Sequence, residues 1–180
     1  DIPHYVMNFR DEFTFRVVDY FCREYIRGRT PNPCIACNRH IKFHSLLNKA
    51  RAMGADYIAT GHYARVIFNA DSQKYELLRS VDTNKDQSYA LYSMTQDQLQ
   101  HTLFPLGGLT KAEVRDIARQ AGLPVAEKAE SQETCFIEKG HYADFVEQFL
   151  GFRAPEGDFV DNAGRILGRH RGIHCYTIGQ

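Results

Sequence analysis

Residues 38–61 read NRHIKFHSLLNKARAMGADYIATG, and this stretch decides the fold class. Its first part predicts a helix over about 38–53, because apolar side chains recur at helical spacing at Phe43, Leu46, Leu47 and Ala50. Residues 56–60 (DYIAT) then predict a buried strand that ends at Gly61. A helix that runs into a short buried strand is typical of parallel α/β folds, in which ligands bind at the carboxyl ends of the strands.

The residues before this stretch predict the same alternation. Residues 5–9 (YVMNF) indicate a short strand, and Asp11 is a suitable N-cap for a helix that Gly28 ends. The apolar face of that helix consists of Phe13, Val17, Phe21 and Tyr25. Two prolines make residues 30–33 a rigid loop, after which Asn38 is the expected N-cap of the second helix.

The residues after it predict a hairpin and a capped helix. Residues 65–68 and 75–78 flank a turn-rich segment and indicate two antiparallel strands. Thr110 and Glu113 form a capping box, in which each side chain satisfies a free backbone donor of the other residue.

Beyond about residue 138 the sequence pattern changes. A helix with an apolar stripe at Tyr142, Phe145, Val146, Phe149 and Leu150 leads into a glycine-rich tail with short strands expected at 158–160 and 165–167. We therefore expect an α/β domain over residues 1–137 and the beginning of a smaller, β-containing domain over residues 138–180.

Composition excludes several classes of protein. Of the 180 residues, 43% are apolar and 24% are charged, as in a globular protein with a buried core. No run approaches the roughly 20 apolar residues of a membrane span, so we expect no membrane partner. The five cysteines are an odd number without a secretion signal, which favours thiols, ligands or catalysts in the cytoplasm over a disulfide framework. Because the chain begins with Asp1, we expect a piece of a longer protein.

Charge is distributed unevenly. Basic and acidic residues both total 22, but residues 16–51 contain eight basic and two acidic side chains and carry a net charge of +6. Such a segment is either a face that contacts phosphates or a solvated helix surface, and charge alone does not decide between them.

Cys34 and Cys37 form a CxxC motif between the rigid loop and the expected start of the second helix. The positive end of a helix and nearby cations favour a reactive thiolate there. Two alternatives are less favoured. A structural zinc site needs four ligands, and no second CxxC exists; a thioredoxin-like redox pair follows the first strand of a βαβ unit, whereas a helix and a loop intervene here.

The other cysteines carry weaker signals. Cys135 lies in the polar segment ESQETCF, and a single cysteine is usually a small apolar packing residue. For Cys22 and Cys175 we also favour packing.

Six segments together resemble one family, the tRNA-specific 2-thiouridylases (the MnmA/TrmU family). The segments are GRTPNPCIACNRHIKF (28–43), GADYIATGHYARV (54–66), DTNKDQSYALY (82–92), FPLGGLTKAEVR (104–115), ESQETCFI (130–137) and GRHRGIHCYTIGQ (168–180). The resemblance implies part of a parallel-sheet, HUP-like ATP-pyrophosphatase domain, followed by a small central domain. It implies a cytoplasmic enzyme that uses ATP with Mg²⁺ to replace the 2-oxygen of a tRNA wobble uridine with sulfur, supplied by a persulfide donor or relay protein. The Gly-rich phosphate loop of that family does not occur in these residues, so we expect the chain alone to be inactive.

The resemblance also implies roles for individual residues. Cys37 corresponds to the catalytic nucleophile and Cys135 to the cysteine that carries the incoming sulfur. The residues implied to contact tRNA are Asn32, Pro33, Cys34, His62, Lys85, Asp86 and Gln87. Gly61 corresponds to a nucleotide contact. Many members have Asp at the position of Cys34, so an acid–base role of that Asp is unfilled here or passes to a thiol.

The chemistry agrees with two cysteines far apart in the sequence. After a persulfide has transferred its terminal sulfur to carbon, a second thiolate must break the S–S bond, which leaves a Cys37–Cys135 disulfide to be reduced. Two other hypotheses remain: a metal or iron–sulfur cluster held by Cys34, Cys37 and Cys135 in an RNA-binding module, and a thiol–disulfide oxidoreductase.

Overall fold

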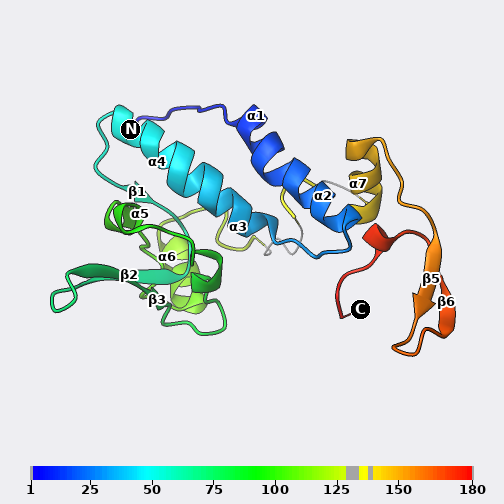
Figure 1. Ribbon diagram of the computed structural model, residues 1–180. Helices are drawn as coiled ribbons and strands as arrows, with labels where there is room; N and C mark the ends of the chain where they lie inside the picture. Colours follow the sequence, from blue (N-terminus) through cyan, green and yellow to red (C-terminus); the bar gives the residue numbers. More distant parts are fainter. Residues whose placement is uncertain (1, 129–133, 138–139, 180) are drawn as a thin grey trace. The chain divides into compact units, whose positions relative to one another are not determined.

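The computed structural model describes residues 2–128, 134–137 and 140–179. It divides into two compact units, each of which Figure 1 traces by colour: unit 1 comprises Asp1–Pro33 and Ser131–Gln180, and unit 2 comprises Cys34–Glu130. Helices and short strands alternate in unit 2 and include a parallel pair, so the expectation of an α/β fold is confirmed.

Unit 2 begins with one long helical run and continues through short strands and helices. In chain order the elements are α3 (Pro33–Cys37), η2 (Asn38–Leu46), α4 (Leu47–Ala52), β1 (Ile58–Ala59), β2 (Ala64–Asn69), β3 (Lys74–Arg79), η3 (Ser88–Ala90), α5 (Gln96–Gln100), β4 (Thr102–Leu103) and α6 (Lys111–Gln120). Strands β2 and β3 form the expected antiparallel hairpin, with Val66 opposite Leu77.

The long helix begins earlier than the sequence indicated. It starts at Pro33, so the prediction that Asn38 caps its N-terminus is wrong. Proline suits the first turn of a helix, because its missing N–H would have no partner there and its φ is already helical. Asn38 instead lies inside the helix and is buried.

The parallel pair β1–β4 joins the two halves of unit 2. Ile58 N–H donates to the carbonyl of His101 at 3.0 Å, and Thr60 N–H donates to that of Leu103 at 3.1 Å. Ile58 of β1 belongs to a buried core with Phe43, Leu47, Ala64 and Leu91, in which Phe43 and Leu47 are each only 1% exposed. The apolar stripe of residues 38–53 therefore faces the strand, as its spacing predicted.

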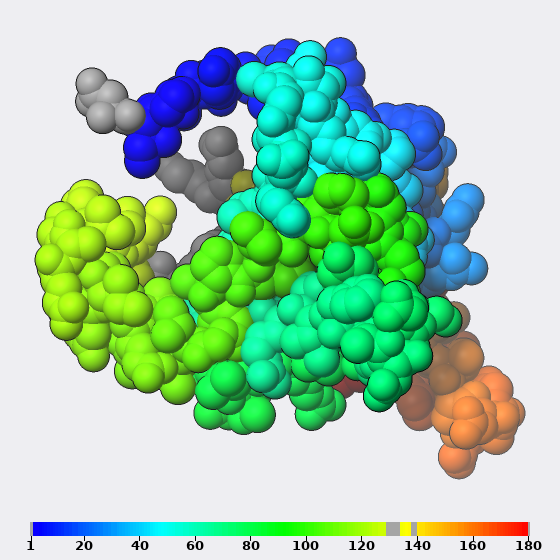
Figure 2. Space-filling model, turned by 90° about the vertical axis from the view of Figure 1, so that its left-hand side faces the viewer, coloured from blue at the N-terminus to red at the C-terminus, as the bar shows by residue number. Residues whose placement is uncertain are grey.

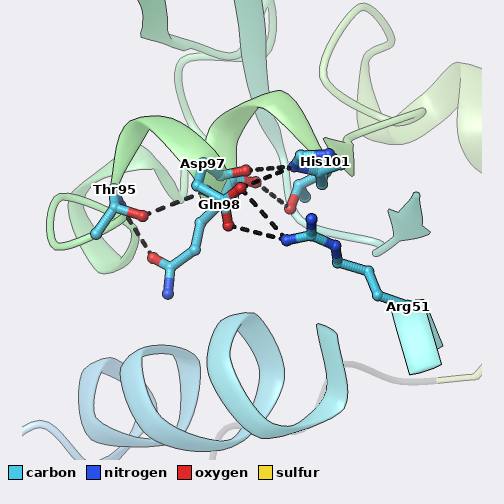
Figure 3. A network of polar contacts seen from close by, with 6 residues as sticks. Arg51, Thr95, Asp97, Gln98 and His101 are labelled. Atoms are coloured by element: carbon cyan, nitrogen blue, oxygen red, sulfur yellow. Dashed lines mark hydrogen bonds and ion pairs between the residues drawn. The ribbon is translucent and has the colours of Figure 1, made fainter. Parts of the chain in front are cut away.

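Helix α5 fixes the chain just before β4. Thr95 and Gln98 form a capping box, in which Gln98 N–H donates to Thr95 Oγ1 at 3.3 Å and Thr95 N–H donates to Gln98 Oε1 at 2.9 Å (Figure 3). Arg51, at the end of α4, donates to the Asp97 carboxylate at 3.3 Å, and Asp97 also contacts His101 (Figure 3). These contacts attach the end of the long helix to the segment that delivers β4.

Helix α6 has the expected capping box, with Thr110 N–H donating to Glu113 Oε2 at 2.7 Å. Gly122 follows the helix with a φ of 65°. The residues of α6 are exposed or half-buried, and its yellow-green segment forms a lobe beside the green surface of the unit in Figure 2.

Unit 1 packs an N-terminal helix against a C-terminal one. Its elements are α1 (Arg10–Phe13), η1 (Thr14–Asp19), α2 (Tyr20–Ile26), α7 (Tyr142–Leu150), β5 (Gly157–Val160), β6 (Ile166–His170) and η4 (Ile173–Cys175). The buried core consists of Val18, Phe21, Cys22, Tyr25, Ile137 and Val146, with Phe13 packed against it. The stripe predicted for the first helix, helix α7 and the β5–β6 hairpin are all confirmed.

Two predictions at the N-terminus are wrong. Residues 5–9 are irregular and not a strand, and Tyr5 and Val6 are 65% and 89% exposed. Residues with high β-propensity do not form a strand unless a neighbouring strand pairs with them. The helix starts at Arg10, whose N–H donates to Asn8 Oδ1 at 2.9 Å, so Asp11 lies in the first turn and is not the N-cap.

Two adjacent glycines provide a matched test of the fold of unit 2. A Cβ on Gly107 would lie 1.7 Å from the carbonyl oxygen of Ala64, whereas a Cβ on Gly108 meets no atom within 4 Å. Because a backbone carbonyl at the base of the hairpin has little freedom to move, we expect Gly107→Ala to lower the free energy of unfolding by at least about 2 kcal/mol. Gly108→Ala should change it by less than about 0.5 kcal/mol. Urea denaturation measures both, and equal stability of the two variants would contradict this packing.

Candidate functional site

The CxxC motif lies in the first turns of the long helix, not before it. Cys34 is exposed and directly follows Pro33, and Cys37 is half-buried at the end of α3. Cys37 is three positions after Cys34, so the two cysteines are neighbours on one surface of the helix. The helix start thus presents a half-buried and an exposed thiol together, next to Asn32, which is exposed.

Asn38 attaches this helix to a distant segment. Its Nδ2 donates to the carbonyl of Ala90 at 3.1 Å, across 52 residues of sequence. The guanidinium of the next residue, Arg39, lies over the ring of Tyr92, 5.9 Å from its centroid. The CxxC helix is therefore held against the segment that follows Lys85, Asp86 and Gln87.

A cavity of about 470 Å³ lies where β1 ends. Its lining residues are Lys42, Leu46, Ala59, Thr60, Gly61, His62 and Gln87. Gln87 is fixed at this place by two contacts with Tyr63: Gln87 Oε1 accepts from the Tyr63 N–H at 3.1 Å, and the Gln87 N–H donates to the Tyr63 carbonyl at 2.9 Å. The structure therefore brings together Gly61, His62 and Gln87, which come from two separate sequence motifs.

His62 lies between the cavity and the core. Its side chain is 9% exposed, its Nδ1 lies 2.8 Å from Thr60 Oγ1, and its ring packs near Phe43 and Phe104. Burial, with a smaller contribution from the charge of Lys42, lowers the pKa of His62 to about 4. The imidazole is therefore neutral at physiological pH and offers a polar edge without a charge.

Asp86 is occupied by contacts inside the unit. Its carboxylate accepts from the Ser80 N–H at 2.9 Å and from the Ser88 hydroxyl at 2.7 Å. Burial alone would raise the pKa of this carboxyl, but the hydrogen bonds from Ser80 and Ser88 outweigh it and hold the pKa below its usual range. Asp86 thus shapes the loop that carries Lys85, which is half-buried and whose N–H donates to the Asp82 carbonyl.

Cys135 lies in unit 1, on an exposed turn closed by a hydrogen bond from the Ile137 N–H to the Thr134 carbonyl at 3.0 Å. The next residue, Phe136, packs edge-on against Phe13 and Phe21, with ring centroids 5.8 and 5.3 Å away. These aromatic contacts anchor the turn and leave the Cys135 thiol at the surface. Cys37 belongs to the other unit, so the approach of the two sulfurs stays a prediction.

Sequence reasoning missed three residues of the unit 2 site. Lys42 and Thr60 line the cavity, and Asn38 anchors the helix. Lys42 was visible only as part of the basic segment, and Thr60 only as the last residue of a strand. For Asn38 the available signal was a polar side chain one position after a cysteine motif, which suggested a cap and not a buried anchor.

Two family models and several curated proteins resemble this chain. Residues 1–139 match the family described as tRNA methyl transferase HUP domain, and residues 143–180 match the tRNA methyl transferase PRC-barrel domain. The chain is 58% identical over its whole length to a tRNA-specific 2-thiouridylase MnmA of Moorella thermoacetica, and 55% and 52% identical over 99% of its length to those of Carboxydothermus hydrogenoformans and Clostridioides difficile. It spans about half the length of these curated relatives.

The fold and the cavity define an α/β domain with a cavity at the carboxyl end of a parallel strand, the place where such folds bind ligands. The chain belongs to the tRNA methyl transferase HUP-domain family. No helix in residues 2–128, 134–137 or 140–179 is long and apolar enough to cross a membrane. None of the comparisons supports the metal or iron–sulfur hypothesis for Cys34, Cys37 and Cys135.

The lowered pKa of His62 makes stability depend on pH. The pKa is about 6.5 in the unfolded chain and about 4 in the folded one, so protons bind preferentially to the unfolded state as the pH falls through this window. When the pH falls from about 7.5 to about 5, we expect the free energy of unfolding of the unchanged chain to decrease. This decrease should be about 2 kcal/mol larger than the decrease in the His62→Gln variant. Urea titrations at both pH values give this difference, and parallel pH profiles would show that His62 is not a buried neutral imidazole.

Proposed function

We propose that this chain is the central part of a tRNA 2-thiouridylase, a sulfurtransferase that replaces the C2 oxygen of a wobble uridine with sulfur in an ATP-dependent reaction. The observation that carries the proposal is the identity of 52–58% to relatives named as 2-thiouridylases over essentially the whole chain, with Cys37 and Cys135 inside the shared segments. The substrates are tRNA, ATP with Mg²⁺, and a persulfide donor or relay protein.

ATP is a substrate that makes the uridine oxygen a leaving group. Attack of the C2 oxygen on the α-phosphate releases pyrophosphate and leaves the oxygen bonded to AMP, which departs far more readily than oxide. The cavity at the end of β1 fits a contact to such a nucleotide: its volume lies in the range of ligand sites, Gly61 offers backbone without a side chain, and Lys42 offers a cation. No residue of the chain is assigned to Mg²⁺.

Two thiols complete the reaction. The terminal sulfur of a Cys135 persulfide attacks C2, and AMP leaves with the oxygen. Cys37 thiolate then attacks the Cys135 sulfur, which releases the thiolated base and forms a Cys37–Cys135 disulfide. An external dithiol supplies two electrons to restore both thiols. The exposed turn of Cys135 suits loading by a donor protein, and the half-buried Cys37 suits a protected resolving step.

The helix start suits contact with the target base. Asn32 and Cys34 are exposed, and Pro33 fixes the backbone between them, so this corner offers a rigid wall to a base that has left its stack. His62 and Gln87 line the cavity, and Lys85 adds a cation on a loop braced by Asp86. Cys34 lies where the family resemblance implies an Asp in many members, so we assign it to base contact and not to proton transfer.

The two thiols are tested by substitution in the full-length enzyme. We expect Cys37→Ser and Cys135→Ser each to reduce 2-thiouridine formation by about a hundredfold or more, because a hydroxyl neither carries persulfide sulfur nor resolves a disulfide. Mass spectrometry of nucleosides from modified tRNA measures the product.

Cys22→Ala is the matched control. Cys22 is buried in the core of unit 1, and burial together with the nearby Asp19 raises the pKa of its thiol to about 12, so it is not a nucleophile at neutral pH. Normal product from Cys135→Ser would refute the assignment, whereas loss of product in all three variants would point to a folding defect.

The basic helix is tested by salt dependence. Arg39 and Lys49 are exposed and lie in the basic segment 16–51. If they contact tRNA phosphates, Arg39→Gln and Lys49→Gln should each lower the slope of log affinity against log salt by about 1. Lys74→Gln removes an exposed charge from strand β3, outside that segment, and should leave the slope unchanged. Filter binding or fluorescence anisotropy measures the slope. If both helix variants leave the slope unchanged, the basic side chains of this helix face solvent and do not contact tRNA.

A further inference from the structure

Three different ligand types converge in unit 1, away from every residue assigned above. Nε2 of His174 lies 2.8 Å from Oε1 of Glu147 and 3.7 Å from Sγ of Cys175. All three ligand atoms lie within 4.8 Å of one another. Glu147 comes from helix α7, while His174 and Cys175 come from η4, so two elements meet at this point.

The imidazole of His174 is built into the fold. The side chain is 0% exposed, and Nδ1 has no hydrogen-bond partner among the described residues, so the polar contacts of the ring are all at Nε2. Gly172 allows this position: a Cβ there would lie 2.6 Å from Cε1 of His174. The absence of a side chain at Gly172 therefore lets the ring lie with Nε2 directed at Glu147 and Cys175.

The cluster lies at the wall of a cavity of about 420 Å³. The residues that line this cavity are His141, Ala143, Asp144, Glu147, Arg153, Arg171, Cys175 and Tyr176. Glu147 and Cys175 therefore face open space, while His174 supports them from behind. A group bound by all three atoms would keep one side accessible from the cavity.

The separations suit a tetrahedral metal ion. With Zn–N and Zn–O bonds of about 2.1 Å and a Zn–S bond of about 2.3 Å, tetrahedral angles place N and S about 3.6 Å apart and N and O about 3.4 Å apart. The observed Nε2–Sγ separation of 3.7 Å matches. The Nε2–Oε1 separation of 2.8 Å is that of a hydrogen bond and needs only a small displacement of the flexible Glu147 side chain.

We propose that Glu147, His174 and Cys175 form a Zn²⁺ site with three protein ligands and a fourth position open to the cavity. A thiolate, an imidazole and a carboxylate are the ligands that Zn²⁺ takes in proteins, and three of them with an open position is the arrangement of accessible zinc sites. Softer or harder first-row ions match this mixed set less well.

A Cys175 thiolate and the Glu147 carboxylate together balance the charge of Zn²⁺, and two arginines lie beside them. Arg153 Nε lies 3.4 Å from Glu147 Oε1, and Arg171 lines the same cavity. When Glu147 Oε1 binds the metal, the second carboxylate oxygen is available for the ion pair with Arg153. Two cations beside an open coordination position favour an anion or hydroxide as the fourth ligand. The site does not depend on the proposed sulfur transfer, because neither Cys37 nor Cys135 belongs to it.

The test is Zn²⁺ binding by the full-length protein in which Cys34, Cys37 and Cys135 are all replaced by Ser, so that, of the cysteines in residues 1–180, only Cys175 and the buried Cys22 remain. We expect one equivalent of Zn²⁺, measured by competition with a chromophoric chelator. With Co²⁺ as the probe we expect a thiolate-to-metal charge-transfer absorption. In the same background, Cys175→Ser, Glu147→Gln and His174→Gln should each weaken Zn²⁺ binding roughly tenfold or more, since even loss of a residue behind a metal ligand costs that much.

Matched controls separate the site from its cavity. His141→Asn removes an imidazole from the cavity wall but keeps an acceptor for the first turn of α7, where His141 Nδ1 now accepts from the Ala143 N–H. It should leave Zn²⁺ affinity and the cobalt spectrum unchanged. Cys175→Ser is nearly isosteric at a half-buried position, and equal unfolding midpoints without metal show that it folds. The proposal is overturned if the triple-Ser chain binds no Zn²⁺, or if Cys175→Ser leaves affinity and the cobalt absorption intact.

Discussion

The buried hydrogen bond from Asn38 to the Ala90 carbonyl is the constraint on which the candidate site of unit 2 depends. A typical hydrogen bond contributes only about 1 kcal/mol net to the stability of the fold. A buried carbonyl or amide left unpaired costs about 1–3 kcal/mol, so arrangements that break this hydrogen bond are disfavoured more strongly than its net contribution suggests. Around it, Phe43 and Leu47 bury their side chains against β1. The helix that carries the CxxC motif therefore has one position relative to the end of the strand.

The environments of the cysteines show how packing assigns chemistry to one side-chain type. Cys22 is buried and its pKa is raised to about 12, which makes it a core residue. Cys135 is exposed on a turn held by the aromatic contacts of Phe136. Cys175 lies beside a buried imidazole and a carboxylate. The thiol is the same in each case, and the solvent and the charges around it decide which reactions are open to it.

Local patterns predicted much of the fold. The hairpin β2–β3, the capping box of Thr110 and Glu113 and helix α7 follow from turn residues, caps and apolar spacing, which act over a few residues. Residues 5–9 were wrongly predicted as a strand because β-propensity reflects packing against a neighbour. The start of the long helix was misplaced because a proline suits both a rigid loop and the first turn of a helix.

The sequence by itself determined the family, the α/β class and the identities of the two thiols proposed for sulfur transfer, because these depend on motifs and short-range periodicity. Only the tertiary structure decided that Asn38 is an anchor, that Asp86 is occupied within its loop, and that Gly61, His62 and Gln87 share one cavity. It alone brought Glu147 of α7 to the His174–Cys175 pair. The physical reason is that burial and convergence depend on contacts between residues far apart in the sequence, and no local pattern records these contacts. The Glu147–His174 and Asn38–Ala90 pairs, separated by 27 and 52 residues, are examples.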